Sequence, residues 1–316
     1  MGTLTLLQHI QTACNEIGLI APSSVIGNSN QQITQLLALS RREGKMQYQR
    51  GVPLNGWPQM RTEYVFNVQS TGLTPCSITA NSNVITFLSP PAVSPQIGWV
   101  VSNSGSSNAS GFTYPTTVTS IAGLPNSVTV SNVSSVTNTK TTIAIGQDTY
   151  PMPSDIDHTI PQTFWDRSFR WQLLGPINPQ EWQVLKSGIS PTGPRRRFRI
   201  FGGNFVVDPV PYDNNQLVYE YYSKNWCQSA GGTTQAEWAA DSDTFRLDDD
   251  AMTLGIIWRY RRAKGLDYTE ERDMYEERMS VVVSRVASSR ALPLNAQAGG
   301  IRLLNSQNTP DTGFGS

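Results

Sequence analysis

A long stretch without charged side chains is the feature that most constrains how this chain can fold. No Asp, Glu, Lys or Arg occurs between Glu63 and Lys140, a span of 76 residues. All 48 charged side chains therefore lie in the other 240 residues of the 316-residue chain. Because the two compositions differ so sharply, we expect the uncharged span to fold as a region of its own.

The uncharged span carries the pattern of a small all-β domain. Its apolar and β-branched runs are separated by turn residues at roughly the 8 to 12 residue spacing of a sandwich or barrel. The runs cover residues 84–88, 98–102, 116–121 and 127–133. We expect this domain to be inserted into a hairpin of strands at 61–68 and 141–145. The alternative is a disordered linker, but the aliphatic and aromatic content exceeds what disorder usually carries.

Helical periodicity marks the two ends of the chain. Apolar residues at spacings of three and four predict a first helix that ends near Gly18 and a second whose face runs toward Met46 and which Val52 and Pro53 end. A third, proline-capped helix is expected to start at Pro179. A long carboxy-terminal helix follows Asp248 to Asp250, with a break expected near Gly265. Strands at 198–201, 205–207 and 217–222 are expected to form a three-stranded meander.

These elements predict an α+β protein. We expect a helical bundle, made of two amino-terminal helices and the long carboxy-terminal helix, packed with a small antiparallel β region. The predicted domains are a core of residues 1–68 plus 141–290, the inserted all-β domain at 69–140, and an extended tail at 291–316.

Charge and cysteine content exclude several classes of protein. The net charge is zero, so a generic polybasic nucleic-acid binder is excluded, because phosphate affinity depends mainly on Lys and Arg. No signal-peptide pattern or membrane-length apolar run occurs, and we expect a soluble, unsecreted protein without a membrane partner. The three cysteines are widely separated, and we expect free, reduced thiols.

Residue patterns typical of catalysis are missing. The sequence contains no nucleophile-elbow, dinucleotide, P-loop or zincin motif. Of the two histidines, His9 is expected to pack inside the protein or lie on its surface and not to act as a ligand. His158 is expected to lie in a turn at residues 155–158. We therefore expect no enzyme activity and no catalytic, cofactor-binding or metal site.

Two groups of arginines are candidates for contacts with a neighbouring subunit or with DNA. The first could contact phosphate, but a solvated turn or a bridge to a neighbour's carboxylates is the favoured alternative. The second faces acidic residues further along the chain, which allows pairing between subunits or within one helix. The groups are Arg195, Arg196 and Arg197, and Arg259, Arg261 and Arg262.

Several sequence segments resemble the head-to-tail adaptor family of short-tailed bacteriophages, also called tail tubular protein A or connector proteins. The stretch GQDTYPMPSD at 146–155 is similar to the family's GQ..YPLP.D stretch. Further similar segments are FWDR at 164–167, GPINPQEW at 175–182 and LGIIWRY at 254–260. The resemblance covers most of the chain and departs at the uncharged insert and at the last twenty-six residues.

This resemblance implies a non-enzymatic structural protein of the virion, assembled in the host cytoplasm and located at the head-tail junction. It implies a ring, usually of twelve copies, between the portal protein and the tail nozzle protein, with double-stranded DNA passing through without sequence-specific binding. A tail fibre is a possible further partner of the insert. A second hypothesis is an adhesive or carbohydrate-binding virion protein, suggested by Trp99 and Tyr114 in the insert.

The carboxy-terminal tail is expected to bind the portal. Its apolar residues stand in a polar setting, and we expect it to become ordered only on the partner, with plain disorder as the alternative. The candidate portal-binding residues are Ile301, Arg302, Leu303 and Leu304.

Overall fold

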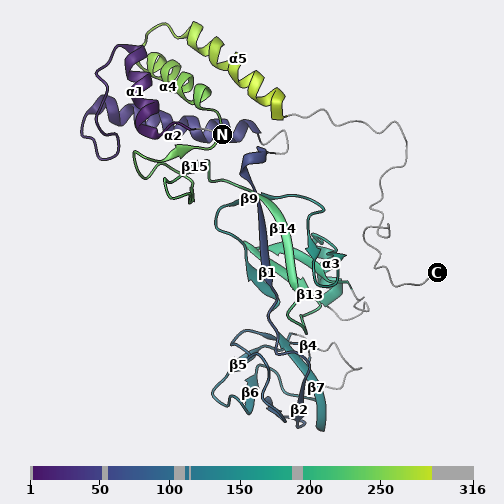
Figure 1. Cartoon of the computed structure of the whole chain (residues 1–316). Coiled ribbons are helices and arrows are strands. Elements are labelled where there is room, and N and C mark those ends of the chain that lie inside the picture. Colours follow the sequence, from purple (N-terminus) through teal and green to yellow (C-terminus); the bar gives the residue numbers. More distant parts are fainter. Residues whose placement is uncertain (1–2, 52–55, 103–110, 114, 187–194, 287–316) are drawn as a thin grey trace, which may run out of the picture. The chain divides into compact units, whose positions relative to one another are not determined.

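The computed structural model describes residues 3–51, 56–102, 111–113, 115–186 and 195–286. Helices combine with several antiparallel sheets, and the predicted α+β class is confirmed (Figure 1). The chain divides into two compact units, one of residues 1–62, 155–159 and 221–316 and one of 63–154 and 160–220. The segment 69–140 falls inside the second unit, and its status as a separate domain stays a prediction.

The described residues of the first unit form four α-helices, and the third of these, α4, packs against the other three. A short 3₁₀ helix, η2 (Pro58–Met60), follows the second of them. The four α-helices are α1 (Leu6–Ile17), α2 (Gln31–Gly51), α4 (Asp249–Lys264) and α5 (Thr269–Val286).

Local capping explains where these helices start and stop. Thr5 and Gln8 form a capping box at the start of α1, and the left-handed Gly18 ends it. At α2 the cap is Asn30, whose side chain accepts a hydrogen bond from the Gln32 N–H at 2.9 Å. Gly265, also left-handed, ends α4, so the break predicted in the long carboxy-terminal helix is confirmed.

Short strands complete the first unit. Three of them form a small sheet with β15 in the middle, and β9 pairs antiparallel with the end of β14. The turn predicted at residues 155–158 is therefore wrong, because Tyr221, Tyr222 and Ser223 of β14 hold this segment extended. The strands are β9 (Ile156–Thr159), β15 (Cys227–Gln228), β16 (Thr234–Gln235) and β17 (Thr244–Phe245).

Two further sheets and one helix occupy the second unit next to the uncharged span. One sheet has the order β1-β14-β10-β11, and the other has the order β12-β13-β8. The elements are β1 (Arg61–Asn67), β8 (Thr149–Pro151), β10 (Trp165–Asp166), β11 (Trp171–Gln172), α3 (Pro179–Lys186), β12 (Arg197–Phe201), β13 (Asn204–Asp208) and β14 (Gln216–Ser223).

The predicted meander is only half right. Strands β12 and β13 form the expected hairpin, but β14 does not join them. Strand β8 takes the free edge of β13, with Tyr150 opposite Phe205, whereas β14 pairs with β10. The helix predicted from Pro179 is confirmed as α3, with the Asn178 side chain accepting the Glu181 N–H at 2.8 Å.

The uncharged span forms a six-stranded sheet of order β4-β7-β2-β3-β6-β5 that closes almost into a barrel. Closure comes from hydrogen bonds between the two end strands, from the Val118 N–H to the Trp99 carbonyl and from the Val101 N–H to the Thr116 carbonyl, each at 2.8 Å. The strands are β2 (Thr74–Ile78), β3 (Val84–Phe87), β4 (Val100–Ser102), β5 (Val118–Ser120), β6 (Ser127–Val130) and β7 (Asn138–Gly146).

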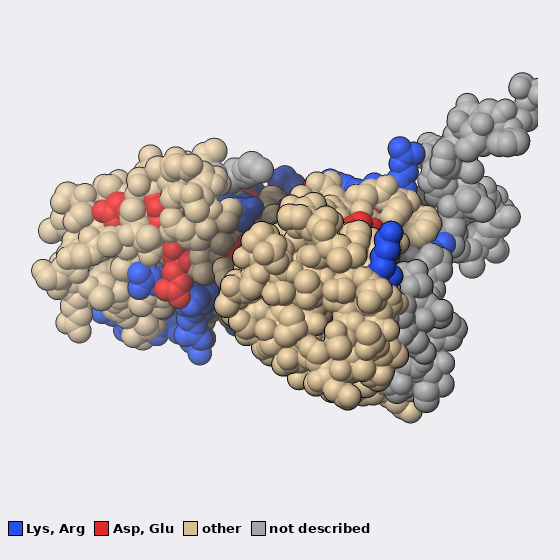
Figure 2. Space-filling view, turned by 90° about the horizontal axis from the view of Figure 1, so that it is seen from below, with Lys and Arg blue, Asp and Glu red and all other residues tan. Residues whose placement is uncertain are grey.

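Strand alternation places the apolar residues of this barrel inside and its Ser, Thr and Asn residues outside. The core includes Ile85, Phe87, Trp99 and Val128. Figure 2 shows a broad tan surface that has blue Lys or Arg atoms only at its edge, and the only charged residue in the barrel strands is Lys140 of β7. The expected hairpin of β1 and β7 does not form, because these strands belong to different sheets. The segment that follows β1 contacts the end of β7 through a bridge between Ser70 and Gly146 and a hydrogen bond from the Thr71 N–H to the Ile145 carbonyl.

Candidate functional site

The predicted basic residue Arg196 lies at the centre of a buried cluster in the second unit. Its side chain is 6% exposed, and its guanidinium pairs with Asp213 and lies 3.7 Å from Asp166. Arg195 and Arg197 on either side are half-buried. A guanidinium held by two carboxylates of its own chain is already neutralised, so within this run Arg196 has its charge committed inside the protomer.

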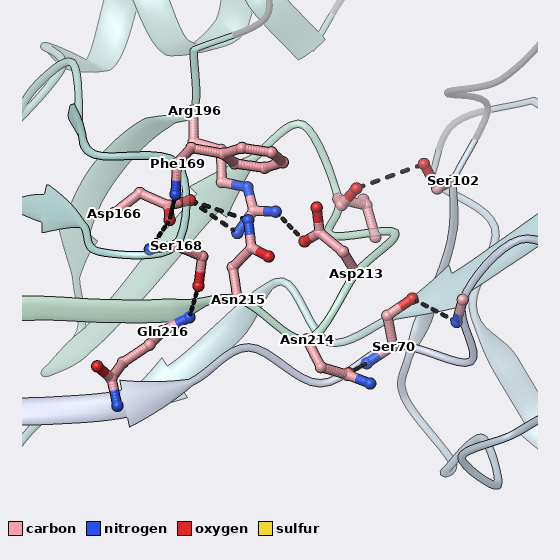
Figure 3. Close-up of polar contacts among 12 residues, drawn as sticks. Ser70, Ser102, Asp166, Ser168, Phe169, Arg196, Asp213, Asn214, Asn215 and Gln216 are labelled. Atoms are coloured by element: carbon pink, nitrogen blue, oxygen red, sulfur yellow. Dashed lines mark hydrogen bonds and ion pairs between the residues drawn. The ribbon is translucent and has the colours of Figure 1, made fainter. Parts of the chain in front are cut away.

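Asp166 joins this cluster to a hairpin turn (Figure 3). One carboxylate oxygen accepts the backbone N–H groups of Ser168 and Phe169, both at 3.0 Å, and the other accepts the Asn215 side-chain amide at 3.2 Å. The Ser168 hydroxyl also accepts the Gln216 N–H at 3.0 Å. The turn between β10 and β11 is therefore held in one conformation by hydrogen bonds to side chains.

The fixed turn presents an exposed aromatic pair. Phe169 is 43% exposed and Trp171 is 39% exposed, and their rings stack with centroids 5.3 Å apart. Arg170 between them is exposed and has a φ of 59°, a left-handed conformation that costs energy in a non-glycine residue. Rigid, exposed Trp, Phe and Arg side chains are the residue types that dominate the binding energy of protein interfaces.

A hollow of about 440 Å³ lies beside the aromatic hairpin, which we define as residues 166–171. Its lining combines charge with apolar surface, including Glu63, Glu220 and Trp165. The Arg167 guanidinium pairs with the Glu63 carboxylate across it. Hairpin and hollow together form a surface suited to receiving a protein segment.

The same loop that carries Asp213 also supports the barrel. The Asn214 side chain accepts the Ser70 N–H at 3.0 Å, and the Ser102 hydroxyl donates to the Val210 carbonyl at 3.4 Å (Figure 3). A Cβ at Gly146 would lie 2.3 Å from the Pro211 carbonyl oxygen, so only glycine fits there. Loop 209–215 thus connects the uncharged barrel to the strands that present the aromatic hairpin.

The second predicted group of arginines is used mainly between helices of one chain. The Arg259 Nε lies 2.7 Å from a buried Glu43 carboxylate oxygen of α2, and Arg261 pairs at 2.9 Å with Glu271 of α5. Only Arg262 of this group is exposed without an ion-pair partner among the described residues. Sequence reasoning considered pairing between subunits or within one helix, and these two pairs are neither.

The buried pair of Glu43 and Arg259 is part of a larger network. Glu43 also accepts the Tyr275 hydroxyl at 2.6 Å and the Gln47 side-chain amide at 3.0 Å. Burial raises the pKa of Tyr275, and the neighbouring Glu43 charge raises it further. Tyr275 therefore stays a neutral hydrogen-bond donor, which leaves no reactive phenolate in this network.

The two histidines differ in burial and in their contacts. His9 is fully buried, with Nδ1 3.2 Å from the Thr253 hydroxyl and Nε2 3.1 Å from the Asp249 carboxylate. His158 stacks on Tyr222 with ring centroids 4.9 Å apart, and its Nδ1 contacts Asp157 at 2.7 Å. In the described part of the chain, no group of three or more His, Cys, Asp or Glu side chains could hold a metal ion.

Some predictions lie elsewhere or stay untested. The tail residues Ile301, Arg302, Leu303 and Leu304 lie outside the described residues. All three cysteines are free, as expected, and they are buried. The aromatic hairpin was missed, although its alternating sequence Phe169-Arg170-Trp171 carried the signal of an exposed turn between two short strands. Among the helices that the structure describes, none has the length and apolar character needed to cross a membrane.

Comparison with known proteins finds one family. Residues 121–298, more than half of the chain, match the sequence model of the SU10 adaptor protein family. The match covers the aromatic hairpin, the Arg196 cluster, α3, α4 and α5. No curated protein matches the chain.

Proposed function

This chain belongs to the SU10 adaptor protein family, and from that premise we propose that it is a structural adaptor of a bacteriophage virion. The family match carries this proposal and supports an adaptor that binds other phage structural proteins. The finer proposal follows the resemblance to head-to-tail adaptors of short-tailed phages. In it, copies of the chain form a ring at the head-tail junction, between the portal and the tail nozzle, through which the genome passes on ejection.

The aromatic hairpin supports a role in docking. Asp166 holds the turn that carries the stacked Phe169 and Trp171 pair. The pair therefore loses little conformational freedom when it binds a partner. Such preorganised aromatic anchors bind a partner without a deep pocket. We assign the hairpin to contacts with another virion protein.

The placement of arginines supports DNA passage without tight binding. Arg196 and Arg259 are buried and paired, so their charges are unavailable for contact with phosphate. The barrel has no cation between residues 63 and 140 to offer. Arginines that are paired within their own chain release no counterions from DNA, and a conduit should not hold the DNA that moves through it.

Catalysis has no part in this proposal, which treats the chain as a binding protein only. The alternative of an adhesive, carbohydrate-binding virion protein loses part of its basis. Trp99 is 7% exposed and lies in the barrel core, and Tyr114 lies outside the described residues. Binding of the isolated chain on a glycan array would revive the alternative.

The direct test mixes the purified chain with its cognate portal and images the product by electron microscopy. We expect a ring of copies bound to one end of the portal. The double variant Phe169→Ala with Trp171→Ala should fold normally and bind at least about tenfold more weakly to whichever partner contacts the hairpin. Phe201→Ala removes an aromatic side chain that is 64% exposed on another hairpin and serves as the matched control.

The tail proposal has its own test. A chain shortened after residue 291 should fold as the full chain does and should fail to dock on the portal. Normal docking of the shortened chain would exclude a portal-binding role for the residues from Ile301 to Leu304. Separate portal and adaptor particles with the full chain would instead contradict the adaptor function itself.

A further inference from the structure

A small hollow on the helical unit lies between α2 and α4. It has a volume of about 260 Å³, and its apolar lining is formed by Leu39, Trp258 and Ala263. Arg42 and Arg262 line the same hollow, and both are exposed. Neither has an ion-pair partner among the described residues, in contrast to Arg259 and Arg261 beside them.

The lining indicates what kind of group fits. The hollow is smaller than the pockets of roughly 300 to 1,000 Å³ that usually bind small-molecule ligands. It has room for a single side chain, with an apolar body against Trp258 and carboxylates beside the two arginines. A phosphate backbone would gain nothing from the apolar lining, so an acidic protein segment fits better than DNA.

Helix α5 carries an exposed stripe with these properties. Glu270, Met274, Glu277 and Val281 follow one another at spacings of four and three, which places them on one face. All four are exposed, and Met274 is 50% exposed. Neither glutamate has an ion-pair partner in the part of the chain that the structure describes. An apolar side chain flanked by carboxylates is thus available one helix away from an apolar hollow flanked by arginines.

The stripe cannot reach the hollow of its own chain. Tyr275 and Met279 are the buried residues of α5, and the Tyr275 hydroxyl contacts Glu43 in the core. The stripe lies on a different side of the helix from these anchors, so it faces away from α2 and α4. Only another molecule can bring such a stripe to the hollow.

We propose that the hollow of one copy receives Met274 of a second copy, with Arg42 and Arg262 paired to Glu270 and Glu277 of that copy. The two surfaces of this contact differ, so each copy can bind one neighbour on each side. Contacts of this head-to-tail type generate a ring when the rotation closes. The inference rests on the proposed adaptor function, since it names the contact between copies in the assembly.

Charge reversal on each side, followed by mixing, tests the contact. The full chain carrying Arg42→Glu with Arg262→Glu, and the full chain carrying Glu270→Arg with Glu277→Arg, should each self-associate at least about tenfold more weakly than wild type. An equimolar mixture should recover association, because one pocket and one stripe again have opposite charges. Lys224→Glu, an exposed charge reversal elsewhere in the first unit, is the matched control.

Sedimentation velocity at high protein concentration, alone and with the portal, gives the readout. If either charge-reversed chain fails to fold, Met274→Ser tests the same contact without altering charge and should also weaken association. Variants that associate like wild type, or a mixture that does not recover, would overturn the contact. So would a wild-type chain that never self-associates.

A DNA-binding role for the same arginines is a separate outcome. If Arg42→Glu with Arg262→Glu abolishes binding to a fluorescent DNA duplex and leaves self-association unchanged, the hollow binds phosphate and our proposal is wrong. Ring formation on the portal by these variants would refute the contact while leaving the adaptor function intact. Absence of any portal complex with wild type would refute the function itself.

Discussion

The helical unit and the uncharged barrel stabilise their interiors in opposite ways. The helical unit buries a charged network in which Glu43 contacts Arg259, Tyr275 and Gln47. The barrel core is formed by apolar side chains, among them Ile85, Phe87 and Val128, and the polar side chains that its strands bury, such as Thr74 and Thr141, are uncharged. The first interior depends on matched partners, whereas the second depends on the volume that its side chains fill.

The charged interior and the uncharged barrel contribute differently to assembly. A buried ion pair has demanding geometry and fixes the relative position of the helices that contribute it, here α2, α4 and α5. The barrel exposes Ser, Thr and Asn, and Lys140 of β7 is the one charged residue in its strands, so the barrel attracts or repels a neighbour only weakly over a distance. Long-range steering of this adaptor must therefore come mainly from regions outside the barrel.

The largest effect should come from breaking the charged network. Glu43→Ala leaves Arg259 buried without a carboxylate and should reduce the free energy of unfolding of the helical unit by about 3–5 kcal/mol. Urea denaturation, followed by hydrogen exchange of peptides from α4, measures it. Glu237→Ala removes the exposed pair with Lys45 and should cost less than about 1 kcal/mol. Equal costs for the two variants would show that the buried network does not hold the unit together.

A cavity in the barrel should have a somewhat smaller effect, confined to the barrel. Ile85 is fully buried, and Ile85→Ala should cost about 2–5 kcal/mol because its methyl groups leave an unfilled space. Val84→Ala, on the outer face of the same strand, should change stability by no more than about 0.5 kcal/mol. Hydrogen exchange in residues 74–87 separates the two, and similar exchange rates would contradict the assigned barrel interior.

The next largest effect should come from acid, which should destabilise the helical unit before the barrel. The Arg50 guanidinium lowers the pKa of Glu276, and the pKa of Asp249 is lowered because contacts with His9 and the Thr3 N–H outweigh the opposing effect of burial. A lowered pKa in the folded state contributes stability above the ordinary range near 4, and this stability is lost as the pH falls through the folded value. Hydrogen exchange below about pH 4 should accelerate in the helical unit before the barrel, which has no carboxylate between residues 63 and 140. Simultaneous loss of protection would remove this contrast.

Salt should have the smallest effect. Raising NaCl from about 0.05 M to about 1 M shortens the screening length to about 3 Å and weakens exposed pairs such as Lys45 with Glu237. The helical unit should lose less than about 1 kcal/mol relative to the barrel, because its central pair is buried. A loss of several kcal/mol in thermal unfolding would show that surface pairs contribute more than the buried network.

The sequence was most informative where structure depends on neighbouring residues. Local signals explain why α1, α3 and the break at Gly265 could be predicted, since Gly18, Asn178 and Gly265 act within one helical turn. Four barrel strands, β3, β4, β5 and β6, were found from alternation and turn spacing in the same local way. Strand β2 was missed, because its residues 74–78 contain a proline at Pro75, and β7 was assigned to a hairpin with β1.

Long-range partners were not predictable by these means. Arg259 and Glu43 are separated by 216 positions, and no local pattern signals that they meet. Strand β14 was assigned to a meander because consecutive strands usually pair, but Tyr150 of β8 occupies that edge instead. The aromatic hairpin depends on Asp166 reaching both Arg196 and Asn215, which only the folded chain brings together.

The most direct test of the adaptor role is electron microscopy of virions produced without this protein, compared with virions from complemented infections. The account predicts DNA-filled heads that lack tails and lose their genome, with normal particles after complementation. Tailed particles that keep their DNA in the absence of this chain would contradict it.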